Sequence, residues 1–259
     1  MRKMTLLLLC LWINASQTLA ETATIASASN FRATLLKLVS DFENKHPHQI
    51  KLVTAATGIL FNQITHGAPF DVFLAADTLR PMQLAKNGAG LGHTRFTYAL
   101  GRLAFAFNPQ ITSPLPDNKK SALDIFRKNT GKIAIANPQT APYGIAAKQC
   151  FHYLFKEQHK LSNKTQAQLV RGANINQAYQ YLVTGNANLG FVALSQLVNS
   201  QNKLRYWIVP SHWHEPIRQQ AILLQSGADN KAAISFMLFL KTTDAKKIIQ
   251  HNGYSTLFQ

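Results

Sequence analysis

The stretch TATIASASNFRATLLKLVSDF, residues 22–42, decides the fold class. Residues 22–27 form a short β-type run, and the small polar turn 28–30 follows. Apolar residues then recur at helical spacing and share one face, at Phe31, Leu35, Leu38 and Phe42. A strand, a small turn and an amphipathic helix in this order are the repeating unit of an α/β fold.

The same unit recurs along the chain, with a Pro-rich loop near 109–117. Further strands are expected at 50–56, 71–75, 102–107, 132–136, 189–193 and 221–224. Helices are expected at 59–65, 79–86, 144–157, 175–182, 232–241 and 245–250. This alternation predicts mixed, mostly parallel sheets flanked by helices.

Residues 1–20 have the pattern of a cleaved secretory signal peptide. Arg2 and Lys3 precede a short apolar run, and Ala20 ends a stretch suited to cleavage. A mature chain from Glu21 would hold 239 of the 259 residues, enough for two domains of roughly 100–150 residues.

Charge and cysteine content narrow the class of protein further. The chain has 27 Lys and Arg against 11 Asp and Glu, and losing Arg2 and Lys3 would lower its net charge from +16 to +14. This balance fits an anionic ligand, or solubility alone. Loss of Cys10 would leave Cys150 unpaired, which excludes a disulfide scaffold. With 46% hydrophobic and 15% charged residues, the chain is not disordered.

Four turns could bind an anion, at 27–30, 55–58, 141–144 and 173–175, since each follows a strand and opens a helix. A helix start has unpaired backbone N–H groups and a positive dipole end, so converging starts form an anion site without formal charge. Ser29 and Thr57 add hydroxyl donors, and Asn30 adds an amide. Ordinary helix capping explains each turn taken alone.

Other chemistries have weaker support. The sequence has no G-x-S-x-G, H-E-x-x-H or P-loop motif, and the S-x-x-K match at 200–203 lies in a polar loop. Cys150 is expected to be a packed core thiol. The pairs His46/His48 and His212/His214 are expected to be surface histidines, without a carboxylate cluster to complete a metal site. Scattered basic residues do not indicate a nucleic-acid surface.

Six segments, in this order, resemble the periplasmic molybdate-binding proteins of ABC transporters. They are ASNF at 28–31, GAPFDVFLAAD at 67–77, RFTYALGRL at 95–103, IANPQTAPYG at 135–144, GNANLGFVALS at 185–195 and PIRQQA at 216–221. The resemblance implies an α/β, two-lobed periplasmic binding protein fold of type II with two hinge crossovers. Lobe 1 would comprise 21–100 and 209–259, and lobe 2 would comprise 101–208.

The resemblance also implies the ligand contacts: Ser29, Asn30, Thr57, Tyr143 and Ile175. Tyr143 and Ile175 would act mainly through backbone N–H groups, with the Tyr143 hydroxyl as an extra donor. Molybdenum itself would be reached only through oxyanion oxygens, by Ser29, Thr57, Tyr143 and Ile175. Some family members have a ligand-binding tyrosine where this chain has Ala193, and Thr57 replaces the more usual serine.

The expected function is therefore capture of molybdate, with tungstate as a near-isostere, in the periplasm. The expected partners are an ABC transporter permease and its ATPase. The chain is expected to be a monomer, to need no cofactor and to catalyse no reaction. Alternatives are a binding protein for sulfate, phosphonate or ferric iron, and a periplasmic hydrolase on the same scaffold.

Overall fold

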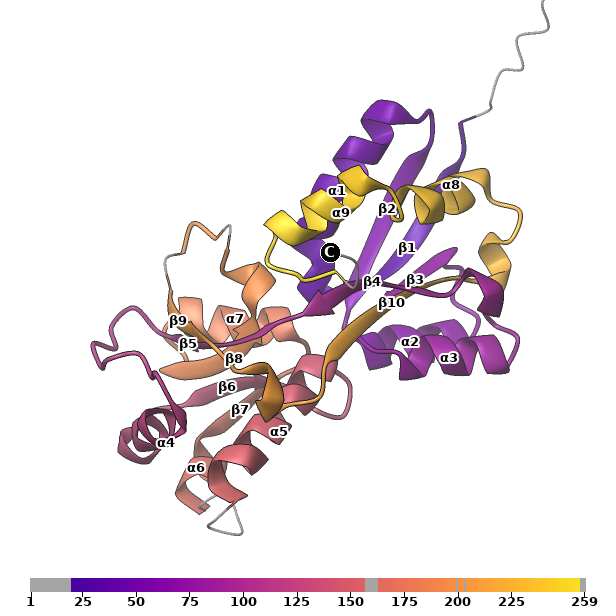
Figure 1. Ribbon diagram of the computed structural model, residues 1–259. Helices are drawn as coiled ribbons and strands as arrows, with labels where there is room; N and C mark the ends of the chain where they lie inside the picture. Colours follow the sequence, from indigo (N-terminus) through magenta and orange to yellow (C-terminus); the bar gives the residue numbers. More distant parts are fainter. Residues whose placement is uncertain (1–19, 157–162, 199, 203, 257–259) are drawn as a thin grey trace, which may run out of the picture.

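The chain folds into two lobes, each built around one sheet (Figure 1). The computed structural model describes residues 20–156, 163–198, 200–202 and 204–256. Within these residues, two sheets of five strands are flanked by helices. Residues 1–19 of the expected signal peptide, Cys10 among them, lie outside the described part of the chain.

The first lobe has the strand order β2-β1-β3-β10-β4. Its strands are β1 (Thr22–Ala28), β2 (Gln49–Ala55), β3 (Val72–Ala75), β4 (Phe96–Gly101) and β10 (Ile217–Leu223). The helices are α1 (Arg32–Lys45), α2 (Thr57–Thr65), α3 (Leu79–Lys86), α8 (Lys231–Phe239) and α9 (Thr243–His251). One sheet face packs against α1, α8 and α9, and the other against α2 and α3 (Figure 1).

The second lobe has the strand order β7-β6-β8-β5-β9. Its strands are β5 (Leu103–Phe107), β6 (Ile133–Ala136), β7 (Leu169–Gly172), β8 (Leu189–Ala193) and β9 (Arg205–Ile208). The helices are α4 (Lys119–Lys128), α5 (Pro142–Phe155), α6 (Asn163–Gln168) and α7 (Ile175–Val183). Aromatic packing dominates this core, where Phe105, Phe126, Phe151 and Phe191 contact one another.

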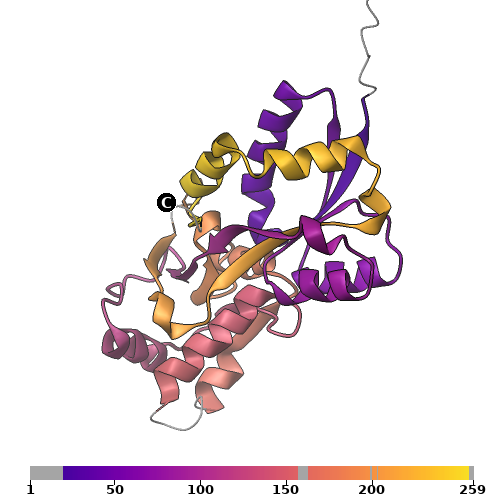
Figure 2. The same ribbon diagram turned by 45° about the vertical axis from the view of Figure 1, so that its right-hand side comes forward.

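The chain crosses between the lobes twice. Arg102 separates β4 from β5, and residues 209–216 join β9 to β10. Figure 2 shows β10 and the segment before it running from one lobe into the other. The two sheets take their strands from 22–101 with 217–223 and from 103–208, and the expected boundaries at 100/101 and 208/209 stay a prediction.

Several elements match their expected positions and others differ. The expected helix 79–86 and strand 189–193 are α3 and β8. Each sheet has two parallel and two antiparallel pairings, so the sheets are mixed as expected but are not mostly parallel, because β10, β5 and their neighbours pair antiparallel. The strand expected at 221–224 begins earlier, at Ile217. The sequence pattern missed this start because the buried position 219 holds a polar residue, Gln219. The expected helix end at Glu157 lies outside the described residues.

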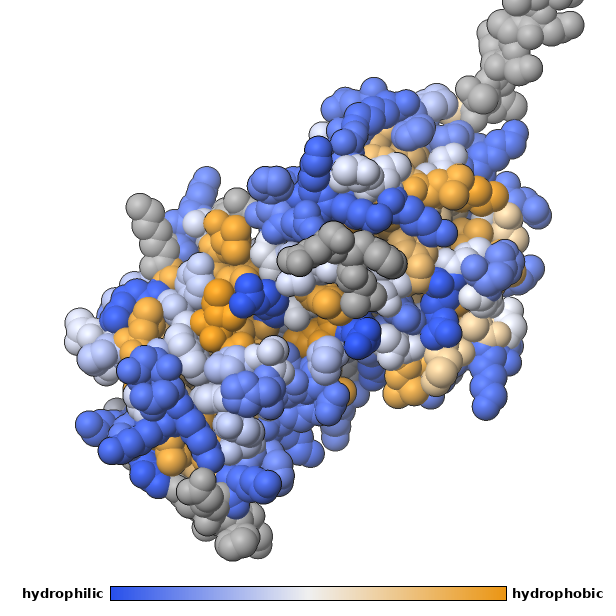
Figure 3. Space-filling view, viewed as in Figure 1, coloured by the Kyte–Doolittle hydropathy of each residue, from blue (hydrophilic) through white to orange (hydrophobic). Residues whose placement is uncertain are grey.

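The surface is largely hydrophilic on the face shown in Figure 3, with small separate hydrophobic areas. Of the large hydrophobic side chains in the described part of the chain, Leu238 on α8 is the most exposed, at 61%. Among the described residues, none of the helices combines the length and the apolar character that a membrane crossing requires.

Candidate functional site

The four predicted turns converge where the two lobes meet. Each follows a parallel strand: β1 leads into the short 3-10 helix η1 (Ser29–Phe31), β2 into α2, β6 into α5 and β7 into α7. Ala28 and Ala56, from the first lobe, belong to the same buried cluster as Tyr143 and Ile175 of the second. The carboxyl ends of strands from two sheets therefore face one another, the usual position for a ligand in such sheets.

All five expected ligand residues lie in this convergence and are buried. Their exposed fractions are 5% for Ser29, 4% for Asn30, 1% for Thr57, 2% for Tyr143 and 3% for Ile175. Each stands in the first turn of its helix, where backbone N–H groups have no partner inside that helix. The site is therefore rich in donors and shielded from bulk water.

The hydroxyl groups of the first lobe are arranged to donate. Thr57 Oγ1 accepts a hydrogen bond from the backbone N–H of Ala76 at 3.2 Å, which leaves the hydroxyl hydrogen of Thr57 available. Ser29 Oγ has no hydrogen-bond partner among the described residues, so both its hydrogen and its lone pairs are available. Neither hydroxyl caps its own helix through a side-chain hydrogen bond.

The side chain of Asn30 is already engaged. Its Nδ2 group donates to Gln219 Oε1 at 3.0 Å and to the Tyr254 hydroxyl at 3.1 Å, which uses both amide hydrogens. The backbone carbonyl of Asn30 accepts from the Tyr254 hydroxyl at 2.8 Å and from Ser195 Oγ at 3.1 Å. A contact from Asn30 to a ligand would therefore come from its backbone N–H.

Tyr143 reaches from α5 to the hinge. Its hydroxyl accepts a hydrogen bond from Gln219 Nε2 at 3.3 Å. The hydroxyl packs against Gly101, because a Cβ atom there would lie 2.2 Å from the phenol oxygen. Burial raises the pKa of Tyr143 well above its usual value, so the hydroxyl keeps its hydrogen at neutral pH.

Ile175 is held as the first residue of α7. The Asn174 side chain caps the helix by accepting from the backbone N–H of Gln177 at 3.1 Å. Gln196 Nε2 donates to the Ile175 carbonyl at 3.3 Å. The peptide N–H at Ile175 thus has a fixed position at the start of α7.

Direct hydrogen bonds join the two lobes around these turns. The backbone N–H of Gly58 donates to the Thr140 carbonyl at 2.8 Å. Ser195 Oγ donates to the Asn30 carbonyl, and Gln219 bonds to Tyr143. These contacts define a closed arrangement of the lobes.

The ionic groups beside the site pair with each other. Arg80 on α3 forms a salt bridge with Asp77, and its backbone N–H donates to Asp77 Oδ1 at 2.9 Å. A Cβ atom at Gly58 would lie 3.0 Å from Arg80 Nη2, which places this guanidinium beside the first turn of α2. The four turns themselves contain no Asp or Glu.

Residues outside the predicted set complete the site. Gln219, Tyr98, Tyr254 and Ser195 form a buried polar network with Asn30. In the sequence, Gln219 lies in a polar run without helical or strand periodicity, and the tyrosines are far apart. Only the segments matched to the family, at 95–103 and 216–221, pointed toward Tyr98 and Gln219.

The three buried tyrosines are engaged in hydrogen bonds within the protein. Tyr98 and Tyr143 both hydrogen-bond to Gln219, and Tyr254 hydrogen-bonds to Asn30. Burial raises the pKa of all three hydroxyls, which opposes the phenolate form that Fe³⁺ needs. The described residues hold no group of three or more His, Cys, Asp or Glu side chains suited to a metal ion.

The remaining candidates have structural roles. Cys150 is buried in α5, and burial raises the pKa of its thiol to about 12, so it is a packed core thiol. His48 is not a surface residue as expected: it is buried, and its Nδ1 accepts from the backbone N–H of Glu21 at 3.3 Å. Ser200 hydrogen-bonds to the Tyr179 hydroxyl, and Lys203 lies outside the described residues.

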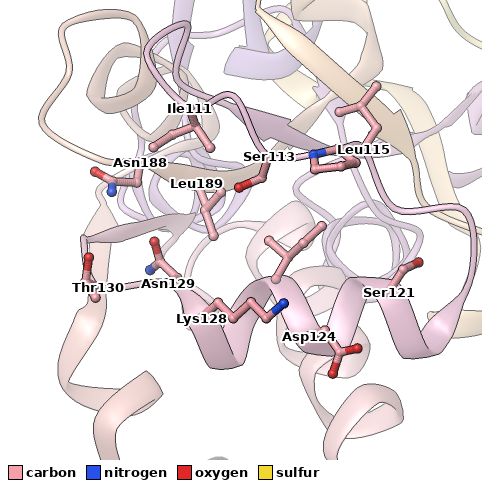
Figure 4. A pocket seen from close by; sticks show the side chains of 12 residues that line it. Ile111, Ser113, Leu115, Ser121, Asp124, Lys128, Asn129, Thr130, Asn188 and Leu189 are labelled. Carbon is pink, nitrogen blue, oxygen red and sulfur yellow. The ribbon is translucent and has the colours of Figure 1, made fainter.

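A separate cavity of about 350 Å³ lies in the second lobe, away from the four turns (Figure 4). It is bounded by α4 and the loop before it, with Lys128, Asp124 and Ser113 in its lining. Polar, charged and apolar side chains all line this cavity, which is open to solvent. No residue of the candidate site contributes to it.

The fold defines a class: a two-lobed binding protein, here with buried hydrogen-bond donors gathered where its lobes meet. Comparisons with known proteins agree. Residues 23–255 match the family model described as bacterial extracellular solute-binding protein. The chain therefore belongs to the bacterial extracellular solute-binding protein family.

Its relatives place it beside the molybdate-binding members of that family. It is 42% identical to the molybdate-binding protein ModA of Azotobacter vinelandii, over 89% of this chain and 88% of the relative. Identity to ModA of Rhodobacter capsulatus is 36%, over 89% and 87%. The solved structure of the A. vinelandii periplasmic molybdate-binding protein superposes with a TM-score of 0.79 at 33% identity, over 90% of this chain and 99% of that one.

Proposed function

We propose that the protein captures molybdate, and tungstate as its near-isostere, in the periplasm and delivers it to an ABC importer. The observation that supports this most is the convergence of four uncharged first turns that offer donors, in a chain 42% identical to a molybdate-binding protein.

The chemistry of the donor set fits a fully deprotonated oxyanion. Molybdate at neutral pH is a tetrahedral dianion whose oxygens only accept hydrogen bonds. Ser29, Thr57 and the backbone N–H groups of Tyr143 and Ile175 are donors toward it. Hydrogen phosphate would bring a P–OH donor to a site without a carboxylate acceptor, and an unpaired buried donor is costly.

Discrimination from sulfate depends on size in this proposal, since sulfate also only accepts. Donors fixed on two rigid lobes fit one anion radius, and a smaller tetrahedron loses contact with part of them. The direct hydrogen bond between Gly58 and Thr140 sets a limit on how closely the lobes can approach a small anion. The site residues act on the ligand without a cofactor.

Closure links capture to delivery. Ser29 and Thr57 belong to the first lobe, and Tyr143 and Ile175 to the second, so the anion gains its full set of donors only between closed lobes. A permease with its ATPase would recognise that closed form. A signal peptide over residues 1–20 would direct the protein to the periplasm. We propose that it acts there as a monomer.

Isothermal titration calorimetry of the purified protein with molybdate, tungstate, sulfate and phosphate tests the proposal. Tight binding of molybdate and tungstate is expected, with sulfate and phosphate at least about a hundredfold weaker, since unpaired donors cost a few kcal/mol. Tight binding of sulfate or phosphate with no heat from molybdate would reject the assignment.

A further inference from the structure

Gln219 occupies an unusual position for a glutamine. It is fully buried, with 0% exposure, on the hinge strand β10 at the point where the register with β4 shifts. Its side chain joins both lobes, because its oxygen faces Asn30 and Tyr98 and its nitrogen faces Tyr143. Gln219 was not among the ligand residues expected from the sequence.

As the structure assigns them, the hydrogen bonds around Gln219 run in one direction. Tyr254 gives its hydroxyl hydrogen to the Asn30 carbonyl at 2.8 Å, so its oxygen must accept from the Asn30 side chain. This fixes Nδ2 of Asn30 on that side, and its second hydrogen goes to Gln219 Oε1 at 3.0 Å. The Gln219 nitrogen is then left to face Tyr143.

This order determines what the Tyr143 hydroxyl can do. Its oxygen must accept from Gln219 Nε2, so its hydrogen points elsewhere. That hydrogen has no acceptor among the described residues, although Tyr143 is only 2% exposed. An amide turned the other way would accept that hydrogen and remove the donor.

We propose that Gln219 is a positioning residue that keeps the Tyr143 hydroxyl a hydrogen-bond donor toward the anion held between the lobes. The direction is imposed by a relay from Tyr254 through Asn30 to Gln219. The relay would favour anions that only accept hydrogen bonds over partly protonated ones. This inference rests on the proposed function, because it needs an oxyanion in the site.

A double-mutant cycle with molybdate at pH 8 tests the relay. In the wild-type background, Tyr143→Phe is expected to weaken molybdate binding about tenfold, because a buried acceptor loses its donor. Gln219→Glu offers a carboxylate oxygen that captures the Tyr143 hydrogen. In that background Tyr143→Phe is expected to change the affinity less than about twofold.

A second variant reverses the relay from its other end and protects the test against misfolding of the first. Asn30→Asp cannot donate to Gln219, so the glutamine amide turns and presents its oxygen to Tyr143. The effect of Tyr143→Phe is again expected to vanish. Gln220→Glu is the matched control, since Gln220 pairs instead with Thr97 and Arg95. There the tenfold effect is expected to persist.

The outcomes separate this inference from the proposed function. If wild-type protein does not bind molybdate, both fail. If it binds but Tyr143→Phe is silent, or costs the same in every background, the role of Gln219 is overturned while the proposed function stands. Thermal unfolding of each variant without ligand confirms that the compared proteins are folded.

Discussion

At the scale of single residues, the candidate site is characterised by hydroxyl hydrogens that remain available to donate to a ligand. Thr57 and Tyr143 each accept a hydrogen bond from the protein, so the hydroxyl hydrogen of each is left to donate. Asn30 shows the opposite state, because both of its amide hydrogens are used inside the protein. Which atom of a residue faces a ligand thus depends on the neighbours that occupy its other atoms.

Replacing Thr57 by valine tests this reading. Thr57→Val keeps the shape and removes the hydroxyl donor, so molybdate affinity is expected to fall by about 1–3 kcal/mol. Calorimetry measures the change. Thr65→Val, at the exposed far end of α2, is the control and is expected to leave the affinity unchanged. An unaltered affinity for Thr57→Val would make the hydroxyl a purely structural group.

At the scale of elements, the strand–turn–helix units were predictable and the first half of the hinge strand β10 was not. Residues 22–42 predict β1 and α1, because a short β-type run is followed by apolar residues at helical spacing. In β10, burial alternates over Ile217 to Gln219, but the inward residue at 219 is polar, so the alternation is hidden in the sequence. The same glutamine that obscures the strand serves the site.

The residues of the candidate site could be predicted from the sequence, but the hydrogen bonds among them could not. Small polar residues after strands indicate Ser29, Asn30 and Thr57 by type, and the family resemblance adds Tyr143 and Ile175. Convergence and hydrogen-bond direction depend on contacts between residues far apart, such as Asn30 with Tyr254 and Gln219. No local pattern in a sequence records such contacts.

Gly58, in the first turn of α2, marks where the two lobes touch. A Cβ there would lie 3.0 Å from the Thr140 carbonyl oxygen, so Gly58→Ala is expected to hinder closure and weaken molybdate binding by about 1–2 kcal/mol. The unfolding temperature of the ligand-free protein should not fall, since alanine favours the helix.

The control for that variant is Gly92→Ala, where a Cβ would meet Ala85 at 3.3 Å within one lobe. It is expected to leave molybdate affinity as in wild type. Calorimetry and thermal unfolding of both variants give the two measurements. Equal affinities for the two alanine variants would contradict a role for Gly58 in closure.

At the scale of the whole molecule, the second crossover offers an optical report of closure. Trp207 on β9 and Trp213 lie on either side of Val209, and their ring centroids are 5.2 Å apart. Molybdate is expected to change tryptophan emission because Trp213 lies in the segment 209–216, which joins the two lobes. Emission that stays constant while calorimetry shows binding would place the bending elsewhere.

The buried hydroxyls and thiol predict alkaline sensitivity. Burial raises the pKa of Cys150 to about 12, so the folded protein holds this proton where the unfolded chain has lost it. Stability is full below about pH 9 and falls as pH rises, by about 1.4 kcal/mol per pH unit for this group. Tyr98, Tyr143 and Tyr254 act in the same direction at higher pH.

Thermal unfolding between pH 7 and pH 11 measures this slope. Cys150→Ala is expected to flatten the part of the curve that begins near pH 9, at the cost of some core packing at every pH. A curve with the same slope in both proteins would show that the thiol does not contribute to the loss.

The inaccessibility of Cys150 also opens a route to chemical labelling. Because this thiol is buried and stays protonated near neutral pH, maleimide dyes are not expected to react with it in the folded protein. A cysteine introduced at an exposed position such as Ile145, on α5 near the interlobe boundary, would then be the single reactive thiol in a chain that begins at Glu21. A dye attached there would report binding of the proposed molybdate ligand as a change in fluorescence, without any added reagent.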